Sequence, residues 1–338
     1  MGNENNGGQP QHPAELLSAI HGMEAAGIPQ PKLYIMTVLQ AAKVYAGYGE
    51  TGDGRALCER AWEFTESVPA LNHDREVAIH VYDAGWDHRR PRDPMYLTGA
   101  FFLAVEEYGP GSAWVPYLMR ELYWYLQENP DWREFASLRQ REEDQELAED
   151  LHQVAVAALG GFPRGTNHAE RCLRSDVVGF AAQFLFLAGD DLCRQALEEW
   201  LSGPVSGYES GTALVSFLLR LQAYGPARAA AERTLQAVDA NPAATGAEKA
   251  SVLLDVAFGI AMAPDGPGVA RLPELEQRIG NLAHEPFSES EAHVLREKLY
   301  RYVIQRLDEG KEAQEDQLAM FGRLLFDPFQ PAAPGAWN

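Results

Sequence analysis

The chain has 338 residues, of which 46% are hydrophobic, and its 49 acidic and 28 basic side chains give a formal net charge of −21 at pH 7. This length suits one large domain or two smaller ones, and with only 30 glycines and 21 prolines the composition excludes bulk disorder. The acidic excess repels polyanions, so it argues against nucleic acid and an anionic membrane surface as partners.

Apolar residues recur at helical spacing, as in Leu33, Met36 and Leu39, and alternating runs rich in Val, Ile and Thr are missing, so the sequence predicts an all-α fold. Proline, glycine and capping residues divide the first part into helices over 13–26, 31–47, 55–66, 74–83, 94–108 and 113–127. The same signals in the second part predict helices over 132–137, 142–159, 168–187, 190–201, 210–223, 227–240, 246–261, 272–283, 288–308 and 312–325.

Helices joined by loops of a few residues lie antiparallel to their neighbours, so the series predicts antiparallel hairpins stacked as an irregular α-solenoid. A glycine-rich break at 160–165 separates an N-terminal helical region, 13–159, from a C-terminal helical-repeat region, 166–326. We expect residues 1–12 to form a flexible leader and 327–338 an extended tail.

The compartment is predicted from the cysteines and from the length of the apolar segments. Cys58, Cys172 and Cys193 form no paired motif, which is typical of a reducing compartment. The longest strongly apolar stretch has about a dozen residues, whereas a bilayer span takes roughly 20. The sequence therefore predicts a cytoplasmic protein without a membrane segment.

One stretch, 210–242, carries a recognisable repeat pattern. Gly225 stands at the turn between two helices, Ala230 and Ala237 stand at small positions of the second helix, and Pro242 closes it. This stretch resembles a tetratricopeptide repeat, although its first helix departs from the family pattern at Leu214, Leu218 and Leu221. The resemblance implies a TPR-like scaffold that binds a protein or peptide, without catalytic residues. Its binding residues would come from the first helix of each hairpin, and here the candidates are Arg220, Gln222 and Tyr224.

A second candidate site is a metal centre in the polar segment that begins at Asn72. Imidazole and carboxylate groups bind transition metals, and this segment offers His73, Asp74, His80 and Asp83. The His73-Asp74 pair resembles the core of the HD phosphohydrolase family, which implies a helical metal-dependent hydrolase. The alternative is structural, because Asn72 or Asp74 suits a helix N-cap.

A third candidate site is the basic run beside Trp86. Clustered guanidinium groups bind phosphate or carboxylate, and three of them stand close together in Arg89, Arg90 and Arg92. The alternative is a loop whose arginines pair with the acidic groups of the chain itself.

The preferred interpretation is a non-catalytic interaction scaffold or adaptor that binds a basic protein segment and needs no cofactor. One alternative is an acidic protein that mimics nucleic acid, which requires one continuous acidic face built from Glu142, Glu143, Glu146, Glu149, Asp150, Glu198 and Glu199. The other alternative is the metal-dependent hydrolase described above.

Overall fold

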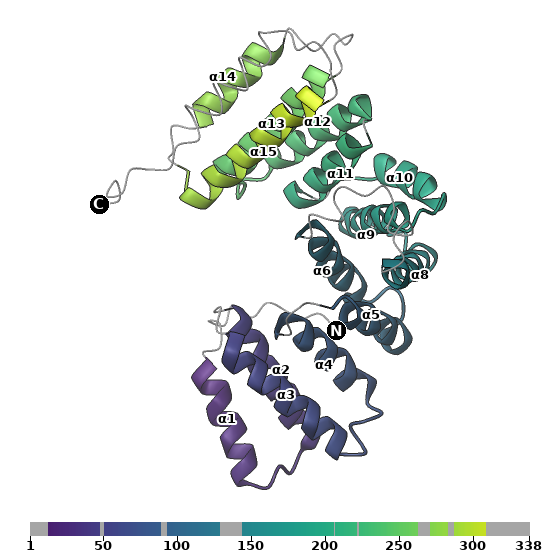
Figure 1. Cartoon of the computed structure of the whole chain (residues 1–338), viewed down its shortest axis with the longest axis vertical. Coiled ribbons are helices and arrows are strands. Elements are labelled where there is room, and N and C mark those ends of the chain that lie inside the picture. Colours follow the sequence, from purple (N-terminus) through teal and green to yellow (C-terminus); the bar gives the residue numbers. More distant parts are fainter. Residues whose placement is uncertain are drawn as a thin grey trace, which may run out of the picture. The chain divides into compact units, whose positions relative to one another are not determined.

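The computed structural model describes residues 13–47, 51–88, 93–128, 144–205, 207–221, 223–262, 271–282 and 287–308. Within these ranges the chain forms helices and no strand, as expected for an all-α fold (Figure 1). The predicted helices at 132–137 and 312–325, the leader and the tail lie outside these ranges. The helices are α1 (Pro13–Ala25), α2 (Pro31–Gly47), α3 (Thr51–Ser67), α4 (Arg75–His88), α5 (Met95–Tyr108), α6 (Trp114–Glu128), α8 (Gln145–Gly161), α9 (His168–Leu187), α10 (Leu192–Ser202), α11 (Tyr208–Arg220), α12 (Tyr224–Ala240), α13 (Gly246–Met262), α14 (Leu272–Leu282) and α15 (Glu289–Asp308).

Capping residues define several helix starts. In front of α13, the backbone N–H of Thr245 donates to Glu248 Oε2 over 2.8 Å, and the N–H of Glu248 donates to Thr245 Oγ1 over 3.1 Å. Ser288 and Glu291 form the same reciprocal pair in front of α15. This is the capping box, which satisfies N–H groups that the first helical turn leaves without partners.

Contacts divide the chain into two units, each made of two segments. Unit 1 comprises Met1–Gly165 and Phe180–Glu198, and unit 2 comprises Thr166–Gly179 and Glu199–Asn338, so α9 contributes to both. The segments predicted from the sequence, 13–159 and 166–326, do not coincide with these units, because residues 180–187 of α9 and most of α10 belong to unit 1.

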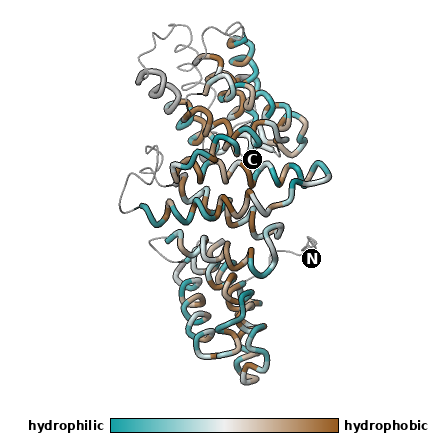
Figure 2. The backbone as a smooth tube through the Cα atoms, turned by 90° about the vertical axis from the view of Figure 1, so that its right-hand side faces the viewer, coloured by the Kyte–Doolittle hydropathy of each residue, from teal (hydrophilic) through white to brown (hydrophobic). Residues whose placement is uncertain are grey.

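Helices α1 to α4 of unit 1 share a hydrophobic core. Residues at helical spacing on α2, among them Ile35, Val38 and Ala42, are fully buried against α1, α3 and α4. Neighbouring helices pair along the chain: α2 packs on α3, α4 on α5 and α5 on α6, and α2 also contacts α4. Figure 2 shows how hydrophobic residues, in brown, recur along the helical turns of the backbone.

Unit 2 is organised around α13, which four other helices surround. Every residue from Ala250 to Ala261 is buried, because α13 packs against α11, α12, α14 and α15. Small residues allow the neighbouring helices to approach closely, and a methyl group added at Gly211 on α11 would overlap the side chain of Thr234 on α12. A stack of hairpins in which alternate helices also touch is compatible with a helical-repeat solenoid.

The end of α4 differs from the sequence prediction, which stopped the helix at Asp83. The helix continues to His88 because Ala84, Trp86 and His88 are buried and extend its apolar side. The Nε2–H of His88 donates to the backbone carbonyl of Ala42 on α2 over 2.6 Å and fixes this end of the helix.

No helix in the described ranges is long and apolar enough to cross a membrane. Cys58, Cys172 and Cys193, which all lie in the described ranges, form no disulfide bond.

Candidate functional site: the face of helices α2, α4 and α6

Side chains from α2, α4 and α6, which are alternate helices of unit 1, meet in one polar network. Asp83 on α4 forms an ion pair with Lys43 on α2 and accepts a hydrogen bond from the Tyr117 hydroxyl on α6 over 3.0 Å. Lys43 Nζ also donates to the Tyr117 oxygen over 3.1 Å. Each of the three groups therefore contacts the other two, and together they link the three helices.

Aromatic contacts extend this link along α4 and α6. His80 packs edge-on against Trp114 with ring centroids 5.1 Å apart, and Trp86 packs against Tyr125 at 5.0 Å. The contacts follow the same order along both helices, so α4 and α6 run parallel. The pairs His80–Trp114 and Asp83–Tyr117 are each 34 residues apart in sequence.

The charge of the network comes from a buried acid and a partly exposed base. Asp83 is 1% exposed, whereas 35% of the Lys43 side chain is exposed. Burial alone would lower the pKa of Lys43, but the Asp83 carboxylate and Tyr117 outweigh burial and raise it. Burial and the Asp83 charge raise the pKa of Tyr117 to about 12. At neutral pH Lys43 is therefore an ammonium and Tyr117 a neutral phenol.

The rim of the network carries further charged groups. Burial raises the pKa of Glu121 on α6, and the neighbouring Asp87 and Asp83 carboxylates raise it further, while Arg120 opposes them. The Arg120 guanidinium also lies 5.8 Å from the centre of the Tyr117 ring. We call the seven residues of this region the α2–α4–α6 face: Lys43, His80, Asp83, Trp114, Tyr117, Arg120 and Glu121.

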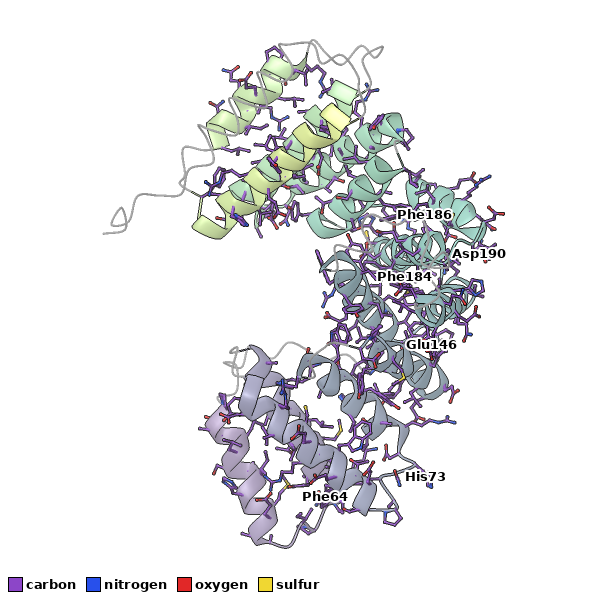
Figure 3. All side chains as sticks on the ribbon, in the orientation of Figure 1. Phe64, His73, Glu146, Phe184, Phe186 and Asp190 are labelled. Carbon is purple, nitrogen blue, oxygen red and sulfur yellow. The ribbon has the colours of Figure 1, made fainter. Side chains whose placement is uncertain are left out.

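The four residues of the predicted metal centre make separate contacts. His73 is exposed in the turn before α4, as Figure 3 shows. Asp74 caps α4, since its Oδ1 accepts a hydrogen bond from the N–H of Val77 over 3.2 Å, and it also pairs with Lys32 over 2.8 Å. His80 contacts Trp114, and Asp83 belongs to the network with Lys43. Among the described residues, no group of three or more His, Cys, Asp or Glu side chains is arranged to hold a metal ion.

Trp86, which the sequence analysis named as a partner-binding candidate, is buried near the end of α4. Its side chain is 2% exposed and packs against Tyr125, because α4 extends past it and turns it toward α6. Arg89, Arg90 and Arg92, which complete the basic run, lie outside the described residues.

The candidates near the repeat-like stretch are described only in part. Tyr224 is partly buried at the start of α12. Gln222 and the side chain of Arg220 lie outside the described part of the chain, so these candidates stay predictions.

The acidic residues proposed to mimic nucleic acid are described in part, and some make internal contacts. Asp150 accepts a hydrogen bond from Thr98 over 2.9 Å, and Glu199 pairs with Arg174 over 2.8 Å. Glu146, Glu149 and Glu198 are exposed, and Figure 3 labels Glu146 on α8. Glu142 and Glu143 lie outside the described ranges.

The sequence prediction missed Lys43 and Tyr117, which complete the network around Asp83. A usable signal was present, because the chain has only five lysines and Lys43 stands in the otherwise apolar run Ala41-Ala42-Lys43-Val44. A lysine that is flanked by apolar residues in a helix needs a carboxylate partner when it is buried. Asp83 also stands among mainly apolar neighbours in its helix, so the two residues were candidates for such a pair.

No protein-family model matches this chain, and a search of curated proteins finds no similar sequence.

Proposed function

We propose that the chain is a non-catalytic, TPR-like scaffold in the cytoplasm that binds a basic segment of another protein on its α2–α4–α6 face. The observation that carries this proposal is the parallel arrangement of α4 and α6, with contacts 34 residues apart in sequence. This spacing equals the length of a tetratricopeptide repeat, in which alternate helices lie side by side. Such an arrangement presents the first helix of each hairpin as a continuous row for an extended ligand.

Charge supports a basic partner. The chain carries a net charge of −21, which attracts cationic segments over distances of about a Debye length. On the face itself, the pKa of Glu121 is raised by burial and by nearby acids. A lysine or arginine from a partner that approached Glu121 would relieve this repulsion, and the interaction would contribute to specificity as well as to the association rate.

Aromatic side chains support protein binding at the same place. Trp114 and Tyr117 are only partly buried, and Trp124, one helical turn beyond Arg120, is among the exposed large side chains. Tryptophan, tyrosine and arginine are enriched among the residues that contribute most to protein interfaces.

The test is a binding assay with defined peptides. Fluorescence anisotropy would compare the affinities of labelled basic, neutral and acidic peptide pools of equal length, at about 0.05 M and about 0.5 M salt. We expect the basic pool to bind best and to lose affinity at high salt. Equal binding of the three pools, or no binding at low salt, would overturn the proposal.

A variant pair then locates the site. Glu121→Gln should weaken binding of the basic pool by about fivefold, because it removes the partly buried charge from the face. The matched control is Glu63→Gln on α3, which removes one exposed charge elsewhere in unit 1. Equal effects of the two substitutions would show that net charge, rather than the α2–α4–α6 face, accounts for binding.

A further inference from the structure

Helix α6 carries a row of aromatic and acidic side chains along one side. Tyr117, Glu121 and Trp124 follow one another at spacings of four and three residues, which places them on successive turns of the same side of the helix. Tyr117 and Glu121 are partly buried, whereas Trp124 is 43% exposed. We call these three residues the α6 row. Along the helix, a carboxylate therefore lies between two aromatic side chains.

The chain's own cations show that this row attracts positive charge. The Arg120 guanidinium lies 3.6 Å from Glu121 Oε1 and 5.8 Å from the centre of the Tyr117 ring. Lys43 Nζ lies 5.3 Å from the centre of the same ring. Distances of about 6 Å or less between a cation and a ring centre are typical of cation–π contacts. The same combination of a carboxylate with aromatic rings is available to a cation of a partner.

The contact between Arg120 and Glu121 is one that a partner can replace. The Arg120 side chain is 47% exposed and the Glu121 side chain 26%, and an ion pair that water reaches contributes little to stability. Their separation of 3.6 Å also exceeds the length of a charge-assisted hydrogen bond, about 2.7–2.9 Å. Asp87 and Asp83 on α4 add negative charge near Glu121. A partner cation that forms a close bond with Glu121 is therefore favoured over the present contact.

The geometry of the row distinguishes the two basic side chains of proteins. A guanidinium group is planar, so its edge can donate two parallel hydrogen bonds to a carboxylate while its face stacks on an aromatic ring. An ammonium group is a compact and strongly hydrated charge without a flat face. Because Trp124 stands one turn from Glu121, one guanidinium can make both contacts. An ammonium must give up more of its hydration to do the same.

We propose that the α6 row selects arginine over lysine in the basic segment that binds this face, with the guanidinium paired to Glu121 and stacked on Trp124. This inference rests on the proposed function, because it names the partner side chain that the same face recognises. It extends the α2–α4–α6 face by one residue, Trp124, which determines specificity.

Two peptide pools that differ only in their basic residue test this selection. They share the same length, number of positive charges and neutral residues, and one carries arginine where the other carries lysine. Fluorescence anisotropy with the full chain at about 0.05 M salt measures the two dissociation constants. We expect the arginine pool to bind about tenfold tighter. Equal affinities, or tighter binding of lysine, would overturn the selection and leave the proposed function standing, whereas no binding of either pool would overturn both.

Variants of Trp124 separate stacking from charge. Trp124→Leu removes the indole but no charge, so it should reduce the preference for arginine from about tenfold to about twofold and change the affinity for the lysine pool by no more than about twofold. Trp124→Phe keeps an aromatic face and should retain most of the preference. Circular dichroism checks that both variants fold, as expected for an exposed position. A Trp124→Leu variant that keeps the full preference would overturn the proposal.

The matched control is Tyr300→Leu, which removes an aromatic ring that is 60% exposed on α15 in unit 2. This substitution should leave both affinities unchanged. An equal loss of the arginine preference in the control would show that the peptides stack on exposed rings anywhere on the chain, and it would contradict recognition by the α6 row.

Discussion

Each of the two units contains a lysine–aspartate pair that joins alternate helices, and the pairs differ in their access to water. In unit 1, Asp83 is paired with Lys43, whose side chain is 35% exposed. In unit 2, Asp255 on α13 is paired with Lys298 on α15 over 2.7 Å, and the Lys298 side chain is only 13% exposed. Lys298 also donates to the backbone carbonyl and the hydroxyl of Ser251 over 3.0 and 2.8 Å.

The tyrosines show the same difference in arrangement. Tyr117 in unit 1 contacts both members of its pair directly. Tyr208 on α11 in unit 2 donates to Ser251 over 3.0 Å, so the hydroxyl of Ser251 stands between Tyr208 and Lys298. The same residue types therefore form an enclosed joint in unit 2 and a partly open one in unit 1.

The largest expected effect comes from removing the acid of the enclosed pair. Asp255→Ala leaves the Lys298 ammonium without its carboxylate in a place that water reaches poorly, and breaking a buried pair in this way costs about 3–5 kcal/mol. Asp83→Ala should cost less, about 2 kcal/mol, because water can solvate Lys43. Urea denaturation of both variants measures the two free energies of unfolding.

A double variant distinguishes an uncompensated charge from lost packing. Replacing both partners in unit 2 by apolar residues of similar size, Asp255→Leu with Lys298→Met, should recover most of the loss, because no buried charge remains. If the double variant is as unstable as Asp255→Ala, or if Asp83→Ala is the more damaging single change, the distinction between enclosed and open pairs is wrong.

A smaller loss of stability is expected from disturbing a close packing contact in unit 1 that involves no ion pair. A methyl group at Gly54 on α3 would overlap the ring of His88, whose Nε2–H is held by the carbonyl of Ala42. Gly54→Ala should therefore destabilise the protein by about 1–3 kcal/mol despite the better helix propensity of alanine.

The control for this packing prediction lies on the same helix. Gly52→Ala adds a methyl group that meets no atom within 4 Å, so it should leave the free energy of unfolding unchanged or raise it slightly. Thermal denaturation of the two variants makes the comparison, and similar midpoints would contradict the close contact between Gly54 and His88.

Many helix boundaries depend on signals in the nearby sequence and were predicted for that reason. The helices Pro31–Gly47 and His168–Leu187 begin and end where proline, glycine and capping signals place them. The end of α4 was predicted too early because Trp86 and His88 are buried by contacts with Tyr125 and Ala42, which are far away in sequence. Signals in the sequence near the end of α4 cannot predict contacts with residues this distant.

The candidate site was harder to predict than the fold. Asp83 was selected for its chemistry, but its partners Lys43 and Tyr117 lie 40 residues before it and 34 residues after it. Only the packing of three helices brings these groups together. The burial of Trp86 was not predicted for the same reason, since the side of a helix that faces solvent depends on which helix packs next to it.

The smallest expected effect is a pH dependence in unit 1. Burial lowers the pKa of His80, and the positive charges of Lys43 and Lys32 on α2 act in the same direction, while Asp83 and Glu76 on α4 oppose them. The folded protein therefore binds fewer protons at this site than the unfolded chain, whose histidine titrates near 6.5. Stability should be full well above this pH and should decline as the pH falls through about 6.5 toward the lower pKa of the folded state.

Two histidine variants assign this dependence to a residue. His80→Phe keeps an aromatic ring against Trp114 and should flatten the decline in the free energy of unfolding over this range, whereas His73→Gln, which changes an exposed histidine, should leave it intact. This pH range lies above the pKa of Asp74. Burial would raise that pKa, but Lys32 and the N–H of Val77 hold it low. If both variants decline like the natural chain, His80 does not lie in the buried contact with Trp114, and the open joint of unit 1 has no titrating neighbour at that position.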